Sequence, residues 1–300
     1  MRLDNLSLQI LRATWALEPR LAINLHDFVG KLFSRDFSPE ILNHRAPLSL
    51  TALAANGDRV ILSAEGEEGK PYNPFDEAPE KSIAILPLKN VMLKDDTWCS
   101  YGTETLANYI KLAAKSTKVS AILMDVDSGG GAVDAIAPLL DANNFVKAQG
   151  KKMFAICDQN ASAAYYFASQ LERVWASNDI SAAVGSIGVM IKFSDLQPYY
   201  EKQGVKFHTI FAPESDAKNE AFELALKGKY DMIKAELLSP LARKFQAAVR
   251  QGRNGKIDLT VKGILSGKMF YAEDATKHGL IDGILTLDQA IEEINKIVKN

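Results

Sequence analysis

Short apolar runs alternate with amphipathic stretches along residues 82–176, and this alternation constrains the fold more than any other feature of the sequence. The apolar runs are rich in Val, Ile and Leu and have no polar face, which is typical of strands buried on both sides of a parallel sheet. We expect strands at residues 83–87, 119–126, 153–157 and 173–176, and helices at residues 103–115, 132–149 and 163–171. The pattern predicts βαβ units and an α/β fold, whose sites lie at the carboxyl ends of the strands.

The pattern after residue 189 is mostly helical, with one interruption. We expect a helix at residues 195–203, an alternating strand at 205–211, a polar loop at 212–220, a long helix at 222–250, and helices at 271–278 and 286–298. The long helix carries apolar residues on more than one face. This second apolar stripe predicts either an interface between subunits or packing against residues 1–80.

Residues 1–80 form a different kind of segment. Periodic apolar residues predict helices at 6–17 and 21–33, and two short alternating runs follow at 48–53 and 59–63. Residues 65–80 are rich in Gly, Pro and acidic residues, which is typical of a linker. We therefore expect an N-terminal accessory segment at 1–80 and the main domain at 81–300.

The composition excludes several classes of protein. The 300 residues are 47% hydrophobic and 24% charged, which describes a globular chain, and 35 basic against 37 acidic residues give no electrostatic reason to bind nucleic acid. Cys99 and Cys157 are too few for a disulfide framework and have no metal-ligand spacing with the histidines. Because no run has the length of a membrane span or the pattern of a secretion signal, we expect a cytoplasmic protein.

A first glycine turn, Asp-Ser-Gly-Gly-Gly at residues 127–131, is expected to end one strand and open a helix. It matches neither the dinucleotide fingerprint nor the P-loop, so nucleotide binding is weakly supported. Backbone N–H groups at glycine can equally hold the oxyanion of an acyl-transfer intermediate. The candidate donors here are Gly130 and Gly131.

A second turn joins the expected strand at 153–157 to the expected helix at 163–171, and Ser162 lies in it. This serine is either a helix N-cap or a nucleophile at the edge of the sheet. A nucleophilic serine needs a base. His26, His44, His208 and His278 show no triad context in the sequence, and a lysine with a depressed pKa is the alternative base.

Several motifs in this order resemble the signal peptide peptidase A group of serine peptidases, particularly its phage head-maturation branch. Residues 127–131 resemble the family's D-S-P-G-G turn, and residues 160–166, Asn-Ala-Ser-Ala-Ala-Tyr-Tyr, resemble its A-A-S-G-G-Y-Y nucleophile turn. Residues 185–189 match G-S-I-G-V without change, and Gly-Leu-Ile-Asp at 279–282 also follows the pattern. The resemblance covers about residues 82–300. Gly129 replaces the family's proline, and Ala163-Ala164 replace its Gly-Gly.

This resemblance implies a Clp-protease/crotonase-like fold with a Ser–Lys dyad and no cofactor. Ser162 would be the nucleophile, Lys218 the general base and Ser186 the residue that orients the lysine. Gly130 or Gly131, together with Ala163, would form the oxyanion hole. The substrate would be a protein or peptide, such as a capsid or scaffold protein, and the assembly a homo-oligomer.

Other interpretations remain for these residues and for the chain. Lys218 can be an exposed loop lysine, Ser186 a turn residue, and Tyr165 and Tyr166 packing residues of the helix. The protein as a whole can instead degrade signal peptides, process acyl-CoA thioesters on a crotonase fold, or serve as a non-catalytic scaffold.

Overall fold

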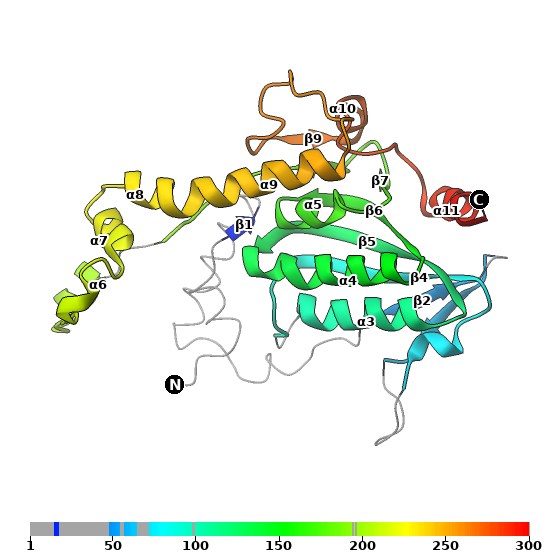
Figure 1. Ribbon diagram of the computed structural model, residues 1–300, viewed down its shortest axis with the longest axis horizontal. Helices are drawn as coiled ribbons and strands as arrows, with labels where there is room; N and C mark the ends of the chain where they lie inside the picture. The colour runs from blue at the N-terminus through cyan, green and yellow to red at the C-terminus, as the bar shows by residue number, and fades with distance from the viewer. Residues whose placement is uncertain are drawn as a thin grey trace.

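The protein folds around one mixed β-sheet with helices on both faces (Figure 1). The computed structural model describes residues 15–17 (backbone only), 48–54, 57–64, 72–97, 100–193, 195 and 197–299. The helix expected at 21–33, residues 65–71 of the linker, His26, His44 and Cys99 lie outside these residues.

The sheet has the strand order β3-β2-β4-β5-β6-β8-β9, with β1 added to β5 and β7 added to β6. Its strands are β1 Trp15–Leu17, β2 Leu50–Leu53, β3 Arg59–Leu62, β4 Ser82–Met92, β5 Val119–Ala132, β6 Lys152–Ala161, β7 Arg173–Ala176, β8 Ala183–Gly185 and β9 Met269–Tyr271. The central pairs β4–β5, β5–β6, β6–β7 and β6–β8 are parallel, whereas β2, β3 and β9 pair antiparallel at the two ends. The parallel centre confirms the α/β class expected from the apolar runs.

Helices cover the sheet in two layers (Figure 1). The helices of the described residues are α3 Thr103–Lys115, α4 Ile136–Ala148, α5 Ala163–Ala168, α6 Gln197–Lys202, α7 Glu220–Leu226, α8 Asp231–Ile233, α9 Ser239–Gly252, α10 Ala272–Lys277 and α11 Leu287–Lys299, with short 3-10 turns at Pro74–Glu77, Val133–Ala135 and Pro213–Ser215. One core lies under α3, α4 and α5 and includes Ile110 and Leu139. The opposite face of the sheet packs against α11, where Phe154 and Trp175 stack at 5.7 Å beside Ile291.

Several expected elements differ in the structure. Residues 205–211 form no strand, because no strand among the described residues lies beside them to complete a ladder, and Ile210 is 92% exposed. The helix expected at 222–250 is divided: α7 ends at Leu226, and Gly228 has φ +75. Helix then resumes at α8 and passes through a π-helical turn at Lys234–Leu238 into α9.

The N-terminal segment also differs from expectation. The helix expected at 6–17 is wrong at its end, since Trp15–Leu17 is the strand β1. Strands β2 and β3 belong to the main sheet, because β2 pairs with β4. Part of the expected linker is core, since Phe75 is fully buried and its carbonyl accepts a bond from Ser116 Oγ.

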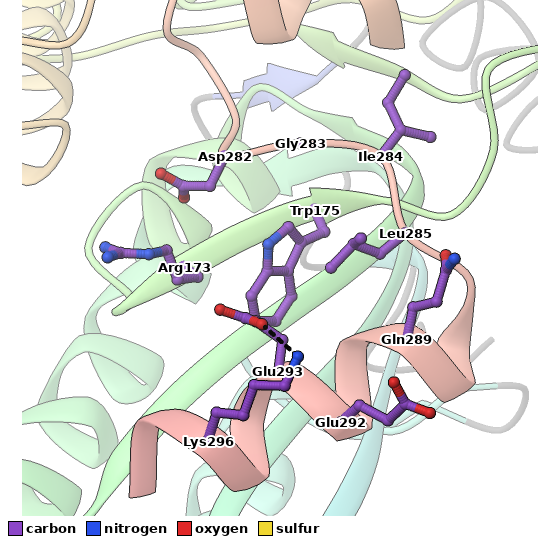
Figure 2. A pocket seen from close by; sticks show the side chains of 10 residues that line it. All are labelled: Arg173, Trp175, Asp282, Gly283, Ile284, Leu285, Gln289, Glu292, Glu293 and Lys296. Atoms are coloured by element: carbon purple, nitrogen blue, oxygen red, sulfur yellow. Dashed lines mark hydrogen bonds and ion pairs between the residues drawn. The ribbon is translucent and has the colours of Figure 1, made fainter. Parts of the chain in front are cut away.

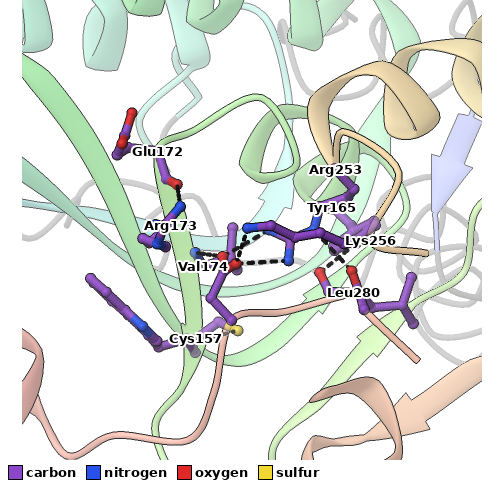
Figure 3. A network of polar contacts seen from close by, with 11 residues as sticks. Cys157, Tyr165, Glu172, Arg173, Val174, Arg253, Lys256 and Leu280 are labelled. Carbon is purple, nitrogen blue, oxygen red and sulfur yellow. Dashed lines mark hydrogen bonds and ion pairs between the residues drawn. The ribbon is translucent and has the colours of Figure 1, made fainter. Parts of the chain in front are cut away.

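A buried ion pair joins the carboxyl-terminal elements to the sheet (Figure 3). Asp282, from the Gly-Leu-Ile-Asp motif, accepts two hydrogen bonds from the Arg253 guanidinium, at 2.8 and 3.0 Å, and a third from the backbone N–H of Val174 in β7. Lys256 Nζ lies 2.7 Å from the same carboxylate. Burial by itself raises a carboxyl pKa, but the bonds and charge of Arg253 outweigh it and hold the pKa of Asp282 at about 2.

Candidate active site

Ser162 lies at the sharp turn where β6 ends and α5 begins. Its backbone has φ 54 and ψ −119, a conformation that costs a non-glycine residue on the order of 1–3 kcal/mol. The turn is held from both sides: Ser162 N–H donates to Gly185 O at 2.9 Å, and Tyr166 N–H donates to Ser162 O at 2.8 Å. Such strained strand-to-helix turns present a nucleophilic serine at the top of a sheet.

Ser162 occupies the N-cap position of α5 but does not cap the helix with its side chain. Its side chain makes no capping bond to the helix, and its hydroxyl instead donates to Gly188 O at 3.4 Å. This bond is long, so the hydroxyl is only weakly held. The first N–H groups of α5, beginning with Ala163, have no acceptor within the helix and point towards this hydroxyl end of the turn.

The sequence predicts that residues 127–131 form a turn that opens a helix. In the structure these residues are instead the end of strand β5. Gly130 and Gly131 pair with Val91 and Met92 of β4. A Cβ at Gly131 would lie 1.9 Å from Met92 O, so no other residue fits there without moving the backbone. The N–H of Gly130 donates to Ser128 Oγ at 3.2 Å.

Ser186 follows directly on β8, next to the residue that holds Ser162 N–H. It is 6% exposed and has φ 53, and its N–H donates to Lys268 O at 3.0 Å. The preceding Gly185 has φ 129, and a Cβ there would lie 2.5 Å from the same Lys268 carbonyl. The structure therefore brings Ser162, Ala163, Ser186 and the glycine pair of β5 to one edge of the sheet.

Lys218 lies away from this edge, between the short Pro213–Ser215 turn and α7, and its side chain is exposed. Residues 197–230, which we call the arm, project from the body of the molecule beyond the end of α9 (Figure 1). Within one chain, Lys218 and Ser162 are not brought together.

The arm exposes an unusual amount of apolar surface. Its large apolar side chains that are more than a third exposed are Tyr199, Tyr200, Val205, Phe207, Ile210, Phe211, Phe222, Leu226 and Tyr230. Exposed large apolar side chains in such number are typical of a region that contacts another protein.

An apolar pocket of about 180 Å³ lies beside the Ser162 turn. Three of its lining residues are Val133, Tyr166 and Val189. Val133 directly follows β5, Tyr166 lies one turn after Ser162 in α5, and Val189 follows Gly188, whose carbonyl accepts the Ser162 hydrogen bond. The remaining lining residues come from α4 and α9: Ile136, Ala137, Leu140, Leu241, Lys244 and Phe245. The pocket suits a large apolar side chain.

Asn160 is a site residue that the sequence reasoning missed. It is fully buried two residues before Ser162, and neither its amide nitrogen nor its amide oxygen has a hydrogen-bond partner among the described residues. Its neighbour Cys157 is a weak partner at best: burial raises the pKa of that thiol to about 12, and its Sγ donates to Trp175 O. The sequence held no clear signal for it, because Asp158 and Gln159 directly before it are polar too.

Other polar features lie away from the Ser162 turn. A hollow of about 390 Å³ between β7 and α11 is lined by Arg173, Trp175, Gln289 and the Glu293–Lys296 ion pair (Figure 2), and it includes none of the expected catalytic residues. His208 lies in the arm, and His278 packs edge-on against Phe270 at 5.9 Å. Tyr165 donates to Leu280 O at 2.6 Å, which confirms its packing role.

A serine on a strained strand-to-helix turn of an α/β sheet, with helix N–H groups beside it, is an arrangement that serine hydrolases use. Residues 146–300, more than half of the chain, match the description "Peptidase family S49". The chain belongs to peptidase family S49. It is a serine peptidase by class, and its mixed sheet with flanking helices is the Clp-protease/crotonase-like fold expected above.

Several proteins of known sequence that are similar to this chain are proteases. A putative protease of Synechocystis is 25% identical over 218 residues, which cover 72% of this chain and 74% of that protein. Protease 4 of Haemophilus influenzae is 25% identical, over 66% of this chain and 31% of its own length. Capsid assembly protease C of Escherichia phage lambda is 29% identical, over 54% of this chain and 37% of its own length. The chain therefore spans about a third of the latter two proteins.

Among solved structures, the 1510-N membrane-bound stomatin-specific protease superposes with a TM-score of 0.47 at 12% identity, over 72% of this chain and 85% of that one. Its complex with a substrate peptide gives a TM-score of 0.45 at 14% identity, over 69% of this chain and 77% of that one. In the part of this chain that the structure describes, none of the helices has the length and apolarity needed to cross a membrane.

Proposed function

We propose that the protein is an endopeptidase with a Ser–Lys dyad, in which Ser162 is the nucleophile and Lys218 the general base. The observation that carries this proposal is the strained, buried Ser162 at the end of β6. Ser162 Oγ attacks the peptide carbonyl carbon and gives its proton to Lys218 Nζ. That proton then passes to the leaving amine as the C–N bond breaks, and water hydrolyses the acyl-enzyme.

The oxyanion of the tetrahedral intermediate needs two N–H donors about 3 Å away. We assign these to Gly131 and Ala163. The N–H of Gly130 is the alternative donor, but it would first have to leave Ser128 Oγ. Ser186, next to the Gly185 carbonyl that holds Ser162, orients the incoming lysine.

The lysine comes from a second copy of the chain. Lys218 lies in the exposed arm, away from the Ser162 of its own chain, and the arm carries the exposed apolar side chains that an interface would bury. In a homo-oligomer the arm of one subunit would reach the serine turn of the next. The base is then withdrawn from solvent only on assembly.

The substrate is a protein of a phage or prophage capsid programme, cleaved in the host cytoplasm or the procapsid. This substrate is supported by the resemblance of the sequence motifs to the phage head-maturation branch and by the similarity to the lambda capsid assembly protease. The apolar pocket beside Ser162 would accept a large apolar side chain next to the scissile bond. Degradation of signal peptides is the alternative, supported by the similarity to Protease 4.

Mass spectrometry of a purified substrate tests this function. The wild-type chain should cleave a capsid protein, a scaffold protein or casein. The Ser162→Ala variant should cleave it about 10⁶-fold more slowly, because the nucleophile is removed. Lys218→Ala and Lys218→Arg should be inactive too, since guanidinium stays protonated. Cleavage by Ser162→Ala at the wild-type rate would place the nucleophile elsewhere, and cleavage of synthetic signal peptides but not of capsid protein would favour the alternative substrate.

A further inference from the structure

The end of β5 has one edge that the central sheet leaves open. On one side, Gly130 and Gly131 pair with Val91 and Met92 of β4. On the other side, β6 pairs with β5 only as far as Ser128, which lies opposite Asn160. Two residues later β6 turns away at Ser162, so residues 130–132 have no partner from β6.

The structure fills this open edge with β1. Trp15 pairs with Ala132, Ala16 with Gly131 and Leu17 with Gly130, in antiparallel register. Because β4 occupies the other edge of the same glycines, β1 must lie on the β6 side. It therefore continues the line of β6, one strand spacing of about 4.8 Å from β5.

The register places β1 beside the catalytic serine. In the parallel β5–β6 pair, Asn160 lies opposite Ser128. Two residues further along each strand, the turn at Ser162 therefore lies level with Gly130. Leu17 is the residue of β1 opposite Gly130. The backbone of β1 therefore passes the N–H groups of the glycine pair and the hydroxyl of Ser162. An extended peptide substrate has to take the same path to be cleaved by Ser162.

We propose that Trp15–Leu17 is a substrate-like strand that the chain supplies to itself, and that an extended peptide must displace it to reach Ser162. This inference rests on the proposed function for the meaning of the site, but the strand exchange does not depend on catalysis. The ligand class is an extended peptide that adds antiparallel to β5 and runs from Ala132 towards Gly130. Val133, which follows this edge, lines the apolar pocket, so the strand and the pocket form one binding surface.

A tethered strand competes strongly with a free one. A segment of the same chain has an effective concentration on the order of 1 mM. Against a free peptide with an intrinsic Kd on the order of 0.1 mM, the tethered copy weakens binding about tenfold. A substitution that breaks the β1–β5 pairing should therefore raise the affinity for the free peptide about tenfold.

The experiment measures binding of a fluorescent peptide with the sequence of residues 12–20, Arg-Ala-Thr-Trp-Ala-Leu-Glu-Pro-Arg, to the full chain carrying Ser162→Ala, which prevents cleavage. Two further variants add Ala16→Pro or Leu17→Pro. Alternate residues of an antiparallel strand direct their N–H groups to the partner, so one of the two prolines removes a ladder donor. That variant should bind the peptide about tenfold more tightly.

Two controls accompany the variants. Ala16→Val keeps the N–H and favours strand structure, so it should bind the peptide no more tightly than the Ser162→Ala chain. A peptide that carries the same proline as the variant with the higher affinity should bind that variant less tightly than the unmodified peptide does. Equal affinity of the unmodified peptide for all the chains, or no binding to any, overturns the proposal.

Hydrogen exchange on the Ser162→Ala chain provides a test that needs no proline. Residues 15–17 should be protected in the absence of peptide and should lose that protection in excess peptide, while residues 130–132 stay protected throughout. Rapid exchange at 15–17 in the absence of peptide overturns the proposal. A wild-type chain without peptidase activity would refute the proposed function but would leave these binding results unchanged.

Discussion

Ser162 combines a strained backbone with a buried side chain. Its φ of 54 is a conformation that glycine adopts freely and other residues avoid. Its neighbour two residues earlier, Asn160, keeps a buried amide without a hydrogen-bond partner among the described residues. Both features oppose stability, and such costs are typical of functional sites.

The strain at position 162 can be measured with two substitutions that both remove the nucleophile. Ser162→Gly should be more stable than Ser162→Ala by about 1 kcal/mol, because glycine tolerates the positive φ. Urea unfolding followed by circular dichroism measures the difference. Equal midpoints and slopes for the two variants would show that the turn relaxes without cost.

The amide of Asn160 should separate stability from activity. Asn160→Leu replaces an unsatisfied polar group by an apolar one of similar size and should raise the unfolding free energy by about 1 kcal/mol. If the amide serves the substrate or the serine turn, kcat/KM should fall in the same variant. A variant that is less stable and fully active would show that the amide is a structural residue.

At the scale of elements, the sequence predicts what depends on local pattern. The runs at 119–126 and 153–157 correctly predict the buried strands β5 and β6, and residues 103–115 are α3 without change. The turn serine and Gly-Ser-Ile-Gly-Val at 185–189 are local motifs, so the sequence also locates Ser162 and Ser186.

The elements that the sequence does not predict depend on contacts with other parts of the chain, and the periodicity of apolar residues does not reveal these contacts. Residues 205–211 alternate as a strand does, but in the described part of the chain no strand lies beside them to pair with. Conversely, the apolar residues 15–17 have a helical pattern but pair with the open edge of β5. The distance between Lys218 and Ser162 likewise follows from the arm's position in the whole molecule.

The Asp282 ion pair joins α9 and the segment after α10 to β7, and it should make stability depend on pH. The folded pKa of Asp282 is about 2, below the unfolded value of about 3.9, so the carboxylate stabilises the fold at any pH above about 4. That contribution, on the order of 2 kcal/mol, is lost as the pH falls from about 4 to 2.

Asp282→Asn tests this contribution. The variant leaves the buried Arg253 without its counter-charge and should be destabilised by about 3 kcal/mol at pH 7. Its unfolding free energy should also change less between pH 5 and 2 than that of the wild-type chain. An unchanged pH dependence, measured by urea unfolding at each pH, would assign the acid sensitivity to other carboxylates.

At the scale of the whole molecule, the exposed arm should determine both assembly and activity. Ile210→Asp puts a charge into the most exposed apolar position of the arm and should convert an oligomer into an inactive monomer by light scattering. Ile61→Asp is the matched control: Ile61 is 77% exposed but lies on β3, so assembly and activity should persist. An active monomer of either variant would contradict the shared site.

Mixing two inactive proteins tests the shared dyad directly. Ser162→Ala supplies an intact Lys218, and Lys218→Ala supplies an intact Ser162, so mixed oligomers should recover part of the wild-type activity. Peptide hydrolysis before and after mixing measures the recovery. No recovery, with subunit exchange confirmed by labelled chains, would require both groups to act within one subunit.

Helix α11 has a consequence for how the protein is made. Its residues Ala290, Ile291 and Ile294 cover the face of the sheet that carries Phe154 and Trp175. Because a chain emerges from the ribosome from its N-terminus onwards, the serine turn and every strand are synthesised before this cover arrives. A nascent chain that already contains Ser162 therefore still lacks the helix that covers this face of the sheet. The order of synthesis thus delays completion of the fold until α11 has been made.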